Sequence, residues 1–136
     1  MKFENYNFLL LTNLLLLYSI IYFFTNNTVH TLIEYILVSL LPFTIFFSQL
    51  FWINPIRYSV IHKIDAFIAK IVISSFIIYT LIYKYNFSYI ILLHFIFLSF
   101  YYNNYYSSKN WCCNNHLFYH ALLHIFCFIA TFYAFI

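Results

Sequence analysis

The sequence of 136 residues contains no glycine, only two prolines and one arginine, and only 7% of its residues are charged. Soluble domains carry about 25% charged residues, so a soluble globular domain of this size is excluded. Phosphate loops, dinucleotide-binding turns and serine-nucleophile elbows require glycine where the backbone turns sharply or approaches a ligand. The absence of glycine therefore excludes these classes of enzyme site.

Cysteine is also scarce, since the chain holds only three. Cys112 and Cys113 are adjacent and can hardly bridge each other, and the odd count that Cys127 completes argues against a disulfide framework. The net charge of +3 is spread along the chain and not clustered. We therefore predict no nucleic-acid partner.

Apolar residues are abundant, at 65% of the chain, and they include 19 Phe and 15 Tyr. Runs of roughly 18 or more apolar residues indicate membrane spans. We therefore predict an all-α, multi-pass helical bundle in the lipid bilayer, forming a single domain. The bias toward Phe, Tyr, Ile, Asn and Lys is typical of an AT-rich genome. Because glycine is absent and alanine and serine are few, aromatic side chains must fill the helix contacts, which leaves room for a cavity.

We predict about five spans, at residues 8–24, 31–52, 64–83, 88–103 and 114–136. The dipeptide Asn54-Pro55 ends the second span, because the residue before a proline avoids the helical conformation. A polar loop is expected over residues 103–110, between the fourth and fifth spans.

Lysine and arginine are distributed unequally between the two sides of this bundle. The N-terminus and the loops after the second and fourth spans carry most of them, namely Lys2, Arg57, Lys63 and Lys109. The other side carries Lys84 alone. The positive-inside rule then predicts the N-terminus on the cytosolic or matrix side and the C-terminus on the opposite side.

Three histidines, His116, His120 and His124, follow one another at intervals of four in the last span. Each step of four residues turns a helix by about 400°, so the three side chains lie on one face. Imidazole in hydrocarbon costs free energy unless it meets a partner, a cavity or water, which makes it a functional candidate. We therefore expect this face to turn toward the bundle interior.

Other polar side chains are expected at a similar depth in the membrane. Ser48 lies near the end of the second span, and His62 and Asp65 lie at the start of the third. His94, counted back along the fourth span, lies at about the depth of His124. The sequence thus predicts an intramembrane cluster of histidine and aspartate side chains.

A zinc ion is one group that such a cluster can hold, since zinc takes about four N, O or S ligands and leaves one position open in a catalytic site. The candidate ligands are His62, His116, His120 and His124. Asp65 and Ser48 are the candidate catalytic residues, with Ser48 placed to donate to a developing oxyanion.

Two further chemistries remain open at this stage. A haem held between His94 and His124 is one, and a proton relay along His62, Asp65 and the histidine face is the other. For each histidine taken singly, the alternative to a functional role is an ordinary role in packing or at the membrane interface. His30, near the opposite boundary, is predicted to be of this last kind.

The serine on an early helix, His62 with Asp65 on a middle helix and the pair His120-x-x-x-His124 on the last helix resemble the signature of the CREST superfamily. These membrane metal-dependent hydrolases include alkaline ceramidases and the progestin and adipoQ receptors. Ser48 or Ser59 matches the family's serine. The resemblance implies zinc bound by three histidines, assisted by the aspartate and the serine, and hydrolysis of amide or ester bonds in lipids. The family has seven helices, two more than we predict here.

Two functions follow from these patterns. The first is a zinc-dependent lipid amide or ester hydrolase. The alternative is a non-catalytic accessory subunit of a membrane complex, such as a respiratory complex, or a bis-histidine haem anchor, with the aromatic surfaces contacting other membrane subunits. Imidazole nitrogens of His62, His120 and His124 within about 5 Å of a common point would favour the metal, because Zn–N bonds are about 2.0–2.1 Å long.

Overall fold

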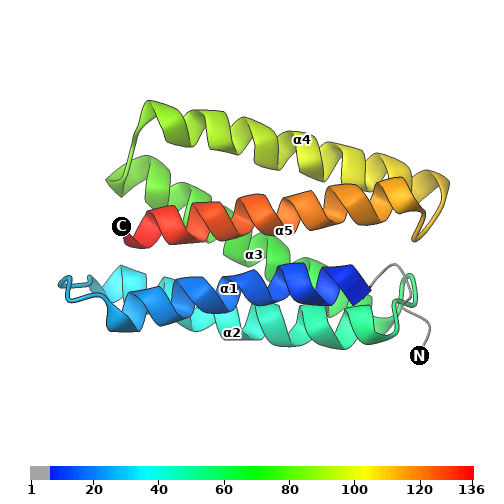
Figure 1. Cartoon of the computed structure of the whole chain (residues 1–136), viewed down its shortest axis with the longest axis horizontal. Coiled ribbons are helices and arrows are strands. Elements are labelled where there is room, and N and C mark those ends of the chain that lie inside the picture. The colour runs from blue at the N-terminus through cyan, green and yellow to red at the C-terminus, as the bar shows by residue number, and fades with distance from the viewer. Residues whose placement is uncertain (1–6) are drawn as a thin grey trace.

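The computed structural model of the chain describes residues 7–136, and this part of the chain folds into five α-helices. They are α1 (Asn7–Thr25), α2 (Leu32–Ile53), α3 (Val60–Tyr83), α4 (Phe87–Lys109) and α5 (Asn114–Phe135). Figure 1 shows them lying lengthwise beside one another, with the chain reversing direction at each loop. The predicted all-α bundle is confirmed.

The bundle has two ends, which we name after the chain termini. The N-terminal end holds the start of α1 and the loops 54–59 and 110–113, and the C-terminal end holds the loops 26–31 and 84–86 and the last residue (Figure 1). The first turn of α1 and the last residue of the chain therefore lie at opposite ends.

Among the helices of residues 7–136, α1, α2, α3 and α5 are each long and apolar enough to cross a membrane. A helix of 22 residues, such as α2, extends about 33 Å, which matches the roughly 30 Å of bilayer hydrocarbon. These four helices indicate an integral membrane protein. The fourth predicted span differs from them, because the second half of α4 is rich in Asn, Tyr and Ser.

Three helices are longer than the sequence predicted: α1 by one residue at each end, and α3 and α4 by more. α3 begins at Val60 instead of 64, because the Ser59 hydroxyl caps the helix by accepting from the backbone amide of His62 at 3.1 Å. α4 continues to Lys109, through the segment predicted as a polar loop. There the ring of Tyr106 stacks on Tyr119 of α5, with 5.6 Å between centroids. This tertiary contact holds a polar segment in the helical form.

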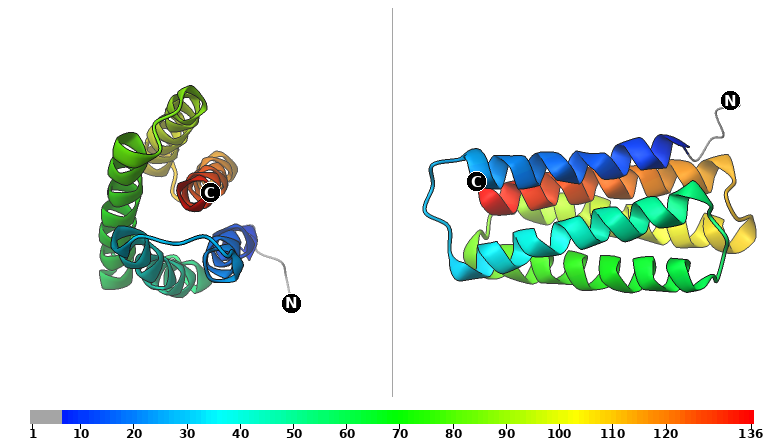
Figure 2. Two further views of the ribbon diagram at one scale, coloured as in Figure 1. Left: turned by 90° about the vertical axis from the view of Figure 1, so that its left-hand side faces the viewer. Right: turned by 90° about the horizontal axis from the view of Figure 1, so that it is seen from below.

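The last helix, α5, makes the most extensive contacts with the other helices. It packs against α4, α1 and α3, while α2 packs against α1 and α3. The view along the bundle in Figure 2 shows α3 on one side and α5 facing it, with α1 and α2 closing one edge. Ala121, Ala130 and Ala134 of α5 are all buried, and such small residues allow the close approach of neighbouring helices.

Large aromatic side chains also take part in the core, although Leu, Ile and Val together outnumber them among the buried apolar residues of the described chain. Trp52, Tyr89 and Phe23 are all fully buried. Trp52 packs near the N-terminal end with Leu9, Phe51, Leu117 and Ala121. A separate cluster around Phe23, Phe76 and Phe135 occupies the C-terminal end. A third cluster, which includes Leu93, Ile96 and Leu123, joins α4 to α5.

A buried carboxylate ties two helices together at the C-terminal end. The Tyr79 hydroxyl of α3 donates to Glu34 Oε1 of α2 at 2.6 Å, and the Thr31 amide donates to Glu34 Oε2 at 2.7 Å. Lys84 Nζ lies 4.0 Å and His30 Nδ1 lies 3.5 Å from this carboxylate. Glu34 thus has a partner for each oxygen, as a buried charge requires.

The packing role predicted for His30 is confirmed. Its ring stacks on Phe23 with 3.8 Å between centroids, and its Nε2 lies 2.9 Å from the Phe23 carbonyl oxygen. His30 therefore closes the loop between α1 and α2.

The substitution Tyr79→Phe tests the contribution of this network. It removes the hydroxyl that donates to Glu34 and keeps the ring, and a hydrogen bond to a charged group contributes about 1.5–3 kcal/mol. We expect a lower Tm in detergent, measured by tryptophan fluorescence. Tyr83→Phe, one turn further along α3 at an exposed position, is the control and should leave Tm unchanged. Equal effects of the two substitutions would contradict the assignment.

Candidate functional site

A cavity of about 410 Å³ lies between the five helices. Every helix contributes polar side chains to its wall, among them Asn13 of α1, Ser48 of α2, Asp65 of α3, Asn103 of α4 and His124 of α5. All six residues singled out from the sequence as metal ligands or catalytic groups line it, namely Ser48, His62, Asp65, His116, His120 and His124. The structure thus brings these residues to one cavity, while their roles stay predictions.

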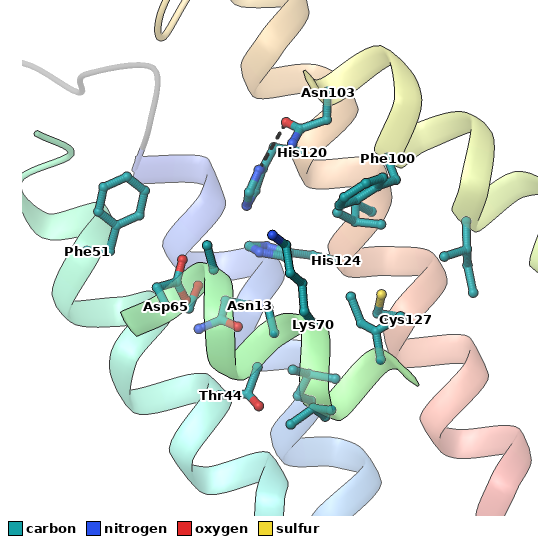
Figure 3. Close-up of a pocket in the computed structure, with 18 of the residues that line it drawn as sticks. Asn13, Thr44, Phe51, Asp65, Lys70, Phe100, Asn103, His120, His124 and Cys127 are labelled. Carbon is teal, nitrogen blue, oxygen red and sulfur yellow. Dashed lines mark hydrogen bonds between the residues drawn. The ribbon is translucent and has the colours of Figure 1, made fainter. Parts of the chain in front are cut away.

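The histidine face of α5 turns inward. His116 is 2% exposed, and the ring centroids are 6.0 Å apart between His116 and His120 and 4.8 Å apart between His120 and His124. Figure 3 shows the rings of His120 and His124 projecting from α5 toward the helices on the far side of the cavity. The bundle interior, and not lipid, surrounds the three imidazoles.

Hydrogen bonds set the tautomers of His120 and His124. His120 Nδ1 lies 3.1 Å from Asn103 Oδ1 (Figure 3), an oxygen that only accepts, so this ring nitrogen is the donor. His124 Nδ1 lies 2.9 Å from Thr12 Oγ1, whose own proton goes to the Leu9 carbonyl at 3.1 Å. His124 Nδ1 is therefore also a donor. Each ring keeps its Nε2 lone pair, the group that acts as a base or a ligand.

His62 and His116 have the opposite tautomer. His62 Nδ1 accepts from the Tyr58 amide at 2.9 Å, and His116 Nδ1 accepts from the Cys112 amide at 3.1 Å. Both Tyr58 and Cys112 have positive φ, 63° and 57°, a conformation that glycine usually provides and that this chain must obtain without glycine. Because Nδ1 accepts, Nε2 carries the proton in both rings. These two histidines stabilise the starts of α3 and α5.

The loops 54–59 and 110–113 meet beside these histidines. Trp111 donates from Nε1 to the Pro55 carbonyl at 3.1 Å, and its ring lies between His62 and His116, at centroid distances of 5.1 and 4.9 Å. Burial, together with the neighbouring Cys113 thiol, raises the pKa of the Cys112 thiol. Its protonated form therefore predominates at neutral pH, which makes it a poor nucleophile.

The four predicted zinc ligands therefore form two pairs and not one donor set. Among residues 7–136, no three His, Cys, Asp or Glu side chains are grouped so that they hold a metal ion. His62 and His116 are engaged at their helix starts, with Trp111 between them, whereas His120 and His124 keep free Nε2 atoms. Zinc binding stays a prediction. His120 and His124 offer two ligands, and the arrangement supplies no third.

His94, the partner suggested for a haem, lies elsewhere. It is exposed, its Nδ1 lies 2.8 Å from the Ile90 carbonyl of its own helix, and it is not part of the cavity wall. The structure does not bring His94 and His124 to a common space. His94 instead provides a control position for experiments on the cavity.

Several polar groups of the cavity have no partner in the described part of the chain. Within residues 7–136, Asp65, which is 8% exposed, makes no hydrogen bond or ion pair, and the more exposed Lys70 makes none either. Asn13 donates to the Ile45 carbonyl at 3.1 Å, but its buried Oδ1 accepts nothing. Figure 3 shows Asp65 and Lys70 directed from α3 into the space beside His124. Unpaired polar groups at this depth are costly, so water or a ligand must satisfy them.

The two serines that match the family pattern have different surroundings. Ser48 is buried, lines the cavity and makes no hydrogen bond within residues 7–136. Ser59 caps α3 and lies outside the cavity wall. Ser48 is therefore the serine that is available to a ligand.

Sequence reasoning missed three residues of the cavity wall: Asn13, Lys70 and Asn103. Asn13 and Lys70 each stand in an apolar stretch, and Asn103 lies at the start of the segment predicted as a polar loop. The only signal was the cost of an amide or an ammonium group within a membrane helix, which marks a residue as important without saying which space it faces.

A comparison of the chain with protein-family models, curated proteins and solved structures finds no match in any of the three. The resemblance to the CREST superfamily therefore stays a prediction carried by the residues named above.

Asp65, which has no partner in the described chain, and Glu34, which has partners, provide a test of whether the Asp65 carboxylate is unpaired in the cavity. Asp65→Asn removes a charge that has no partner, and we expect it to raise stability by about 0.5–2 kcal/mol, as changes at strained functional sites commonly do. Glu34→Gln removes a charge that has partners and should lower stability by about 1–3 kcal/mol. Urea unfolding in detergent measures both. A destabilised Asp65→Asn protein would show that the carboxylate is paired.

Proposed function

We propose that this protein binds the polar head of an amphipathic molecule inside the membrane, in contact with His120, His124 and Asp65. The observation that carries the proposal is the convergence of two imidazole Nε2 acceptors and an unpaired carboxyl group on one cavity. In a bilayer, such a cavity admits water or the head of a lipid-like molecule, because free hydrocarbon tails offer nothing to these polar groups.

Hydrolysis of a lipid amide or ester is the finer form of this proposal. His120 and His124 are oriented by Asn103 and Thr12, so that either Nε2 can take a proton from water as a general base. The water oxygen then bonds to the carbonyl carbon, the bond to the leaving nitrogen or oxygen breaks, and the imidazolium returns the proton to that atom. Ser48 supports a developing oxyanion as a hydroxyl donor.

Zinc-dependent hydrolysis, which the CREST resemblance implies, is a second candidate. It is favoured by His120 and His124, which lie one turn apart on α5 with both Nε2 atoms unprotonated. It requires a third ligand to move into place. If the protein is instead an accessory subunit of a membrane complex, in which the histidines only pack, replacing His120 and His124 should change neither amphiphile retention nor zinc content.

The decisive experiment compares three purified proteins: wild type, the double variant His120→Ala/His124→Ala, and His94→Ala. Bound amphiphiles are extracted after delipidation and quantified by mass spectrometry. We expect the double variant to retain at least about tenfold less amphiphile than wild type, which corresponds to a loss of about 1.4 kcal/mol of binding free energy. His94→Ala should retain as much amphiphile as wild type. Equal retention by all three proteins would favour the accessory role.

Metal analysis of the same three preparations tests the second candidate. Stoichiometric zinc in wild type and His94→Ala, and its loss in the double variant, would support a zinc enzyme. The same trace of zinc in all three would rule this out while leaving amphiphile binding intact.

We further propose that the N-terminal end of the bundle faces the cytosol or matrix. Arg57, Lys63 and Lys109 lie at or near that end, whereas Lys84 is at the other (Figure 1), which supports this orientation by the positive-inside rule. The residues Arg57 and Tyr58, which line the cavity at this end, would then give it access to cytosolic or matrix water.

Cysteine labelling tests this orientation. In a background with Cys112, Cys113 and Cys127 changed to Ser, one new cysteine is placed at the exposed position Asn27 or Ser108. An impermeant maleimide should label Asn27→Cys in intact cells or organelles, and Ser108→Cys only after permeabilisation. The reverse pattern would invert the proposed topology.

A further inference from the structure

A second space, of about 380 Å³, adjoins the cavity between α3 and α4. We call it the portal groove. Six residues line both it and the cavity: Lys70, Ile73 and Ile77 of α3, Ile96 and Phe100 of α4, and Leu123 of α5. The two spaces therefore share a wall, and this wall is the edge of the polar cavity.

The portal groove opens sideways from the bundle. α3 and α4 are consecutive helices but make little contact with each other in the described chain, and Figure 2 shows their ribbons separated along much of their length. The outer flanks of the groove are apolar and exposed, with Ile78 57% and Phe97 60% exposed. In a membrane, the molecules that meet such a surface are lipid chains.

Lys70 stands at the junction of the groove and the cavity. It lies ten residues after the start of α3, about 15 Å along the helix and so near the middle of the hydrocarbon. Its ammonium group has no hydrogen bond or ion pair in residues 7–136. A lysine at this depth is unfavourable in free energy, and an anionic partner offsets this cost.

The charges around the cavity favour an anion. Of residues 7–136, three formally charged side chains line it: Arg57 and Lys70 are cations, and Asp65 is the single anion among them. Asp65 does not pair with Lys70, although both side chains project from α3 into the same space (Figure 3). The ammonium group therefore remains available to a ligand.

We propose that the cavity takes a single-chain lipid carboxylate, which enters from the bilayer between α3 and α4, places its acyl chain in the portal groove and its carboxylate beside Lys70. This inference rests on the proposed binding function and adds the class of ligand, the route and the residue that selects the charge. Because a carboxylate only accepts hydrogen bonds, it receives them from Lys70, and water bridges it to the acceptor Nε2 atoms of His120 and His124. A carboxylate is the smallest anionic head of a membrane lipid. A single chain suits a groove that is bounded by one face of each of two helices.

The chain carries its own reporter for this test. Its two tryptophans, Trp52 and Trp111, both line the cavity, so intrinsic fluorescence of the protein in phosphatidylcholine nanodiscs reports on occupancy. The probes are palmitate, the alcohol of the same chain length and the alkyltrimethylammonium of that length. Together they separate the contribution of the chain from that of the charge.

Two variants separate the route from charge selection. Lys70→Gln removes the ammonium group. Ser74→Phe fills the portal groove at a residue that is not part of the cavity wall. Ser75→Phe is the matched control, because Ser75 lines neither space and its hydroxyl donates to the Ile71 carbonyl of its own helix.

We expect wild type to bind palmitate at least about tenfold more tightly than the alcohol, a difference of about 1.4 kcal/mol, and the alkylammonium more weakly still. Lys70→Gln should abolish the preference for palmitate. Ser74→Phe should weaken binding of palmitate and the alcohol, and Ser75→Phe should not. A preference that survives Lys70→Gln, or equal effects of the two serine variants, would overturn the inference.

The outcome also separates this inference from the proposed function. If wild type binds all three probes equally and His120→Ala/His124→Ala abolishes binding, the cavity is an amphiphile site and the charge selection by Lys70 is wrong. If none of the probes changes the fluorescence of wild type, this inference is wrong, and the mass spectrometry of bound amphiphiles decides the proposed function independently.

Discussion

The constraint on which this structure depends is that lipid does not solvate imidazole, carboxylate or ammonium groups. A chain with so few charged residues keeps few charged groups and histidines within its membrane helices, and several of these line one cavity. The histidine face of α5 meets Asp65 and Lys70 of α3 and Asn13 of α1 across one cavity. The apolar clusters at the two ends of the bundle hold the helices around this space.

Four histidines on two helices divide into two functional kinds, and the division follows from one hydrogen bond in each ring. Where Nδ1 accepts from a backbone amide, as in His62 and His116, the imidazole supports a helix start and presents a protonated Nε2. Where Nδ1 donates to a side-chain oxygen, as in His120 and His124, Nε2 keeps its lone pair. Only the second kind offers a base or a ligand to the cavity.

The two acids within the described helices show the same contrast between structural and functional roles. Glu34 has a donor for each oxygen and joins α2 to α3, which is the arrangement that makes a buried charge stabilising. Asp65 has none within residues 7–136 and faces the cavity. Natural proteins tolerate such unpaired groups mainly where they contact a ligand or a reactant, which is why we place the functional centre around Asp65.

The sequence by itself determined the helical membrane class and the inward histidine face, because hydropathy and the period of 3.6 residues are local properties. It also placed Ser48, His62 and Asp65 near that face by depth alone. The tertiary structure decided what the sequence left open. Contact between Tyr106 and Tyr119 kept the end of α4 helical, the backbone amides of Tyr58 and Cys112 engaged two of the four predicted ligands, and Asn103 and Thr12 fixed the tautomers of the other two. The contacts of Tyr106, Asn103 and Thr12 with α5 join residues far apart in the chain, so no local pattern encodes them.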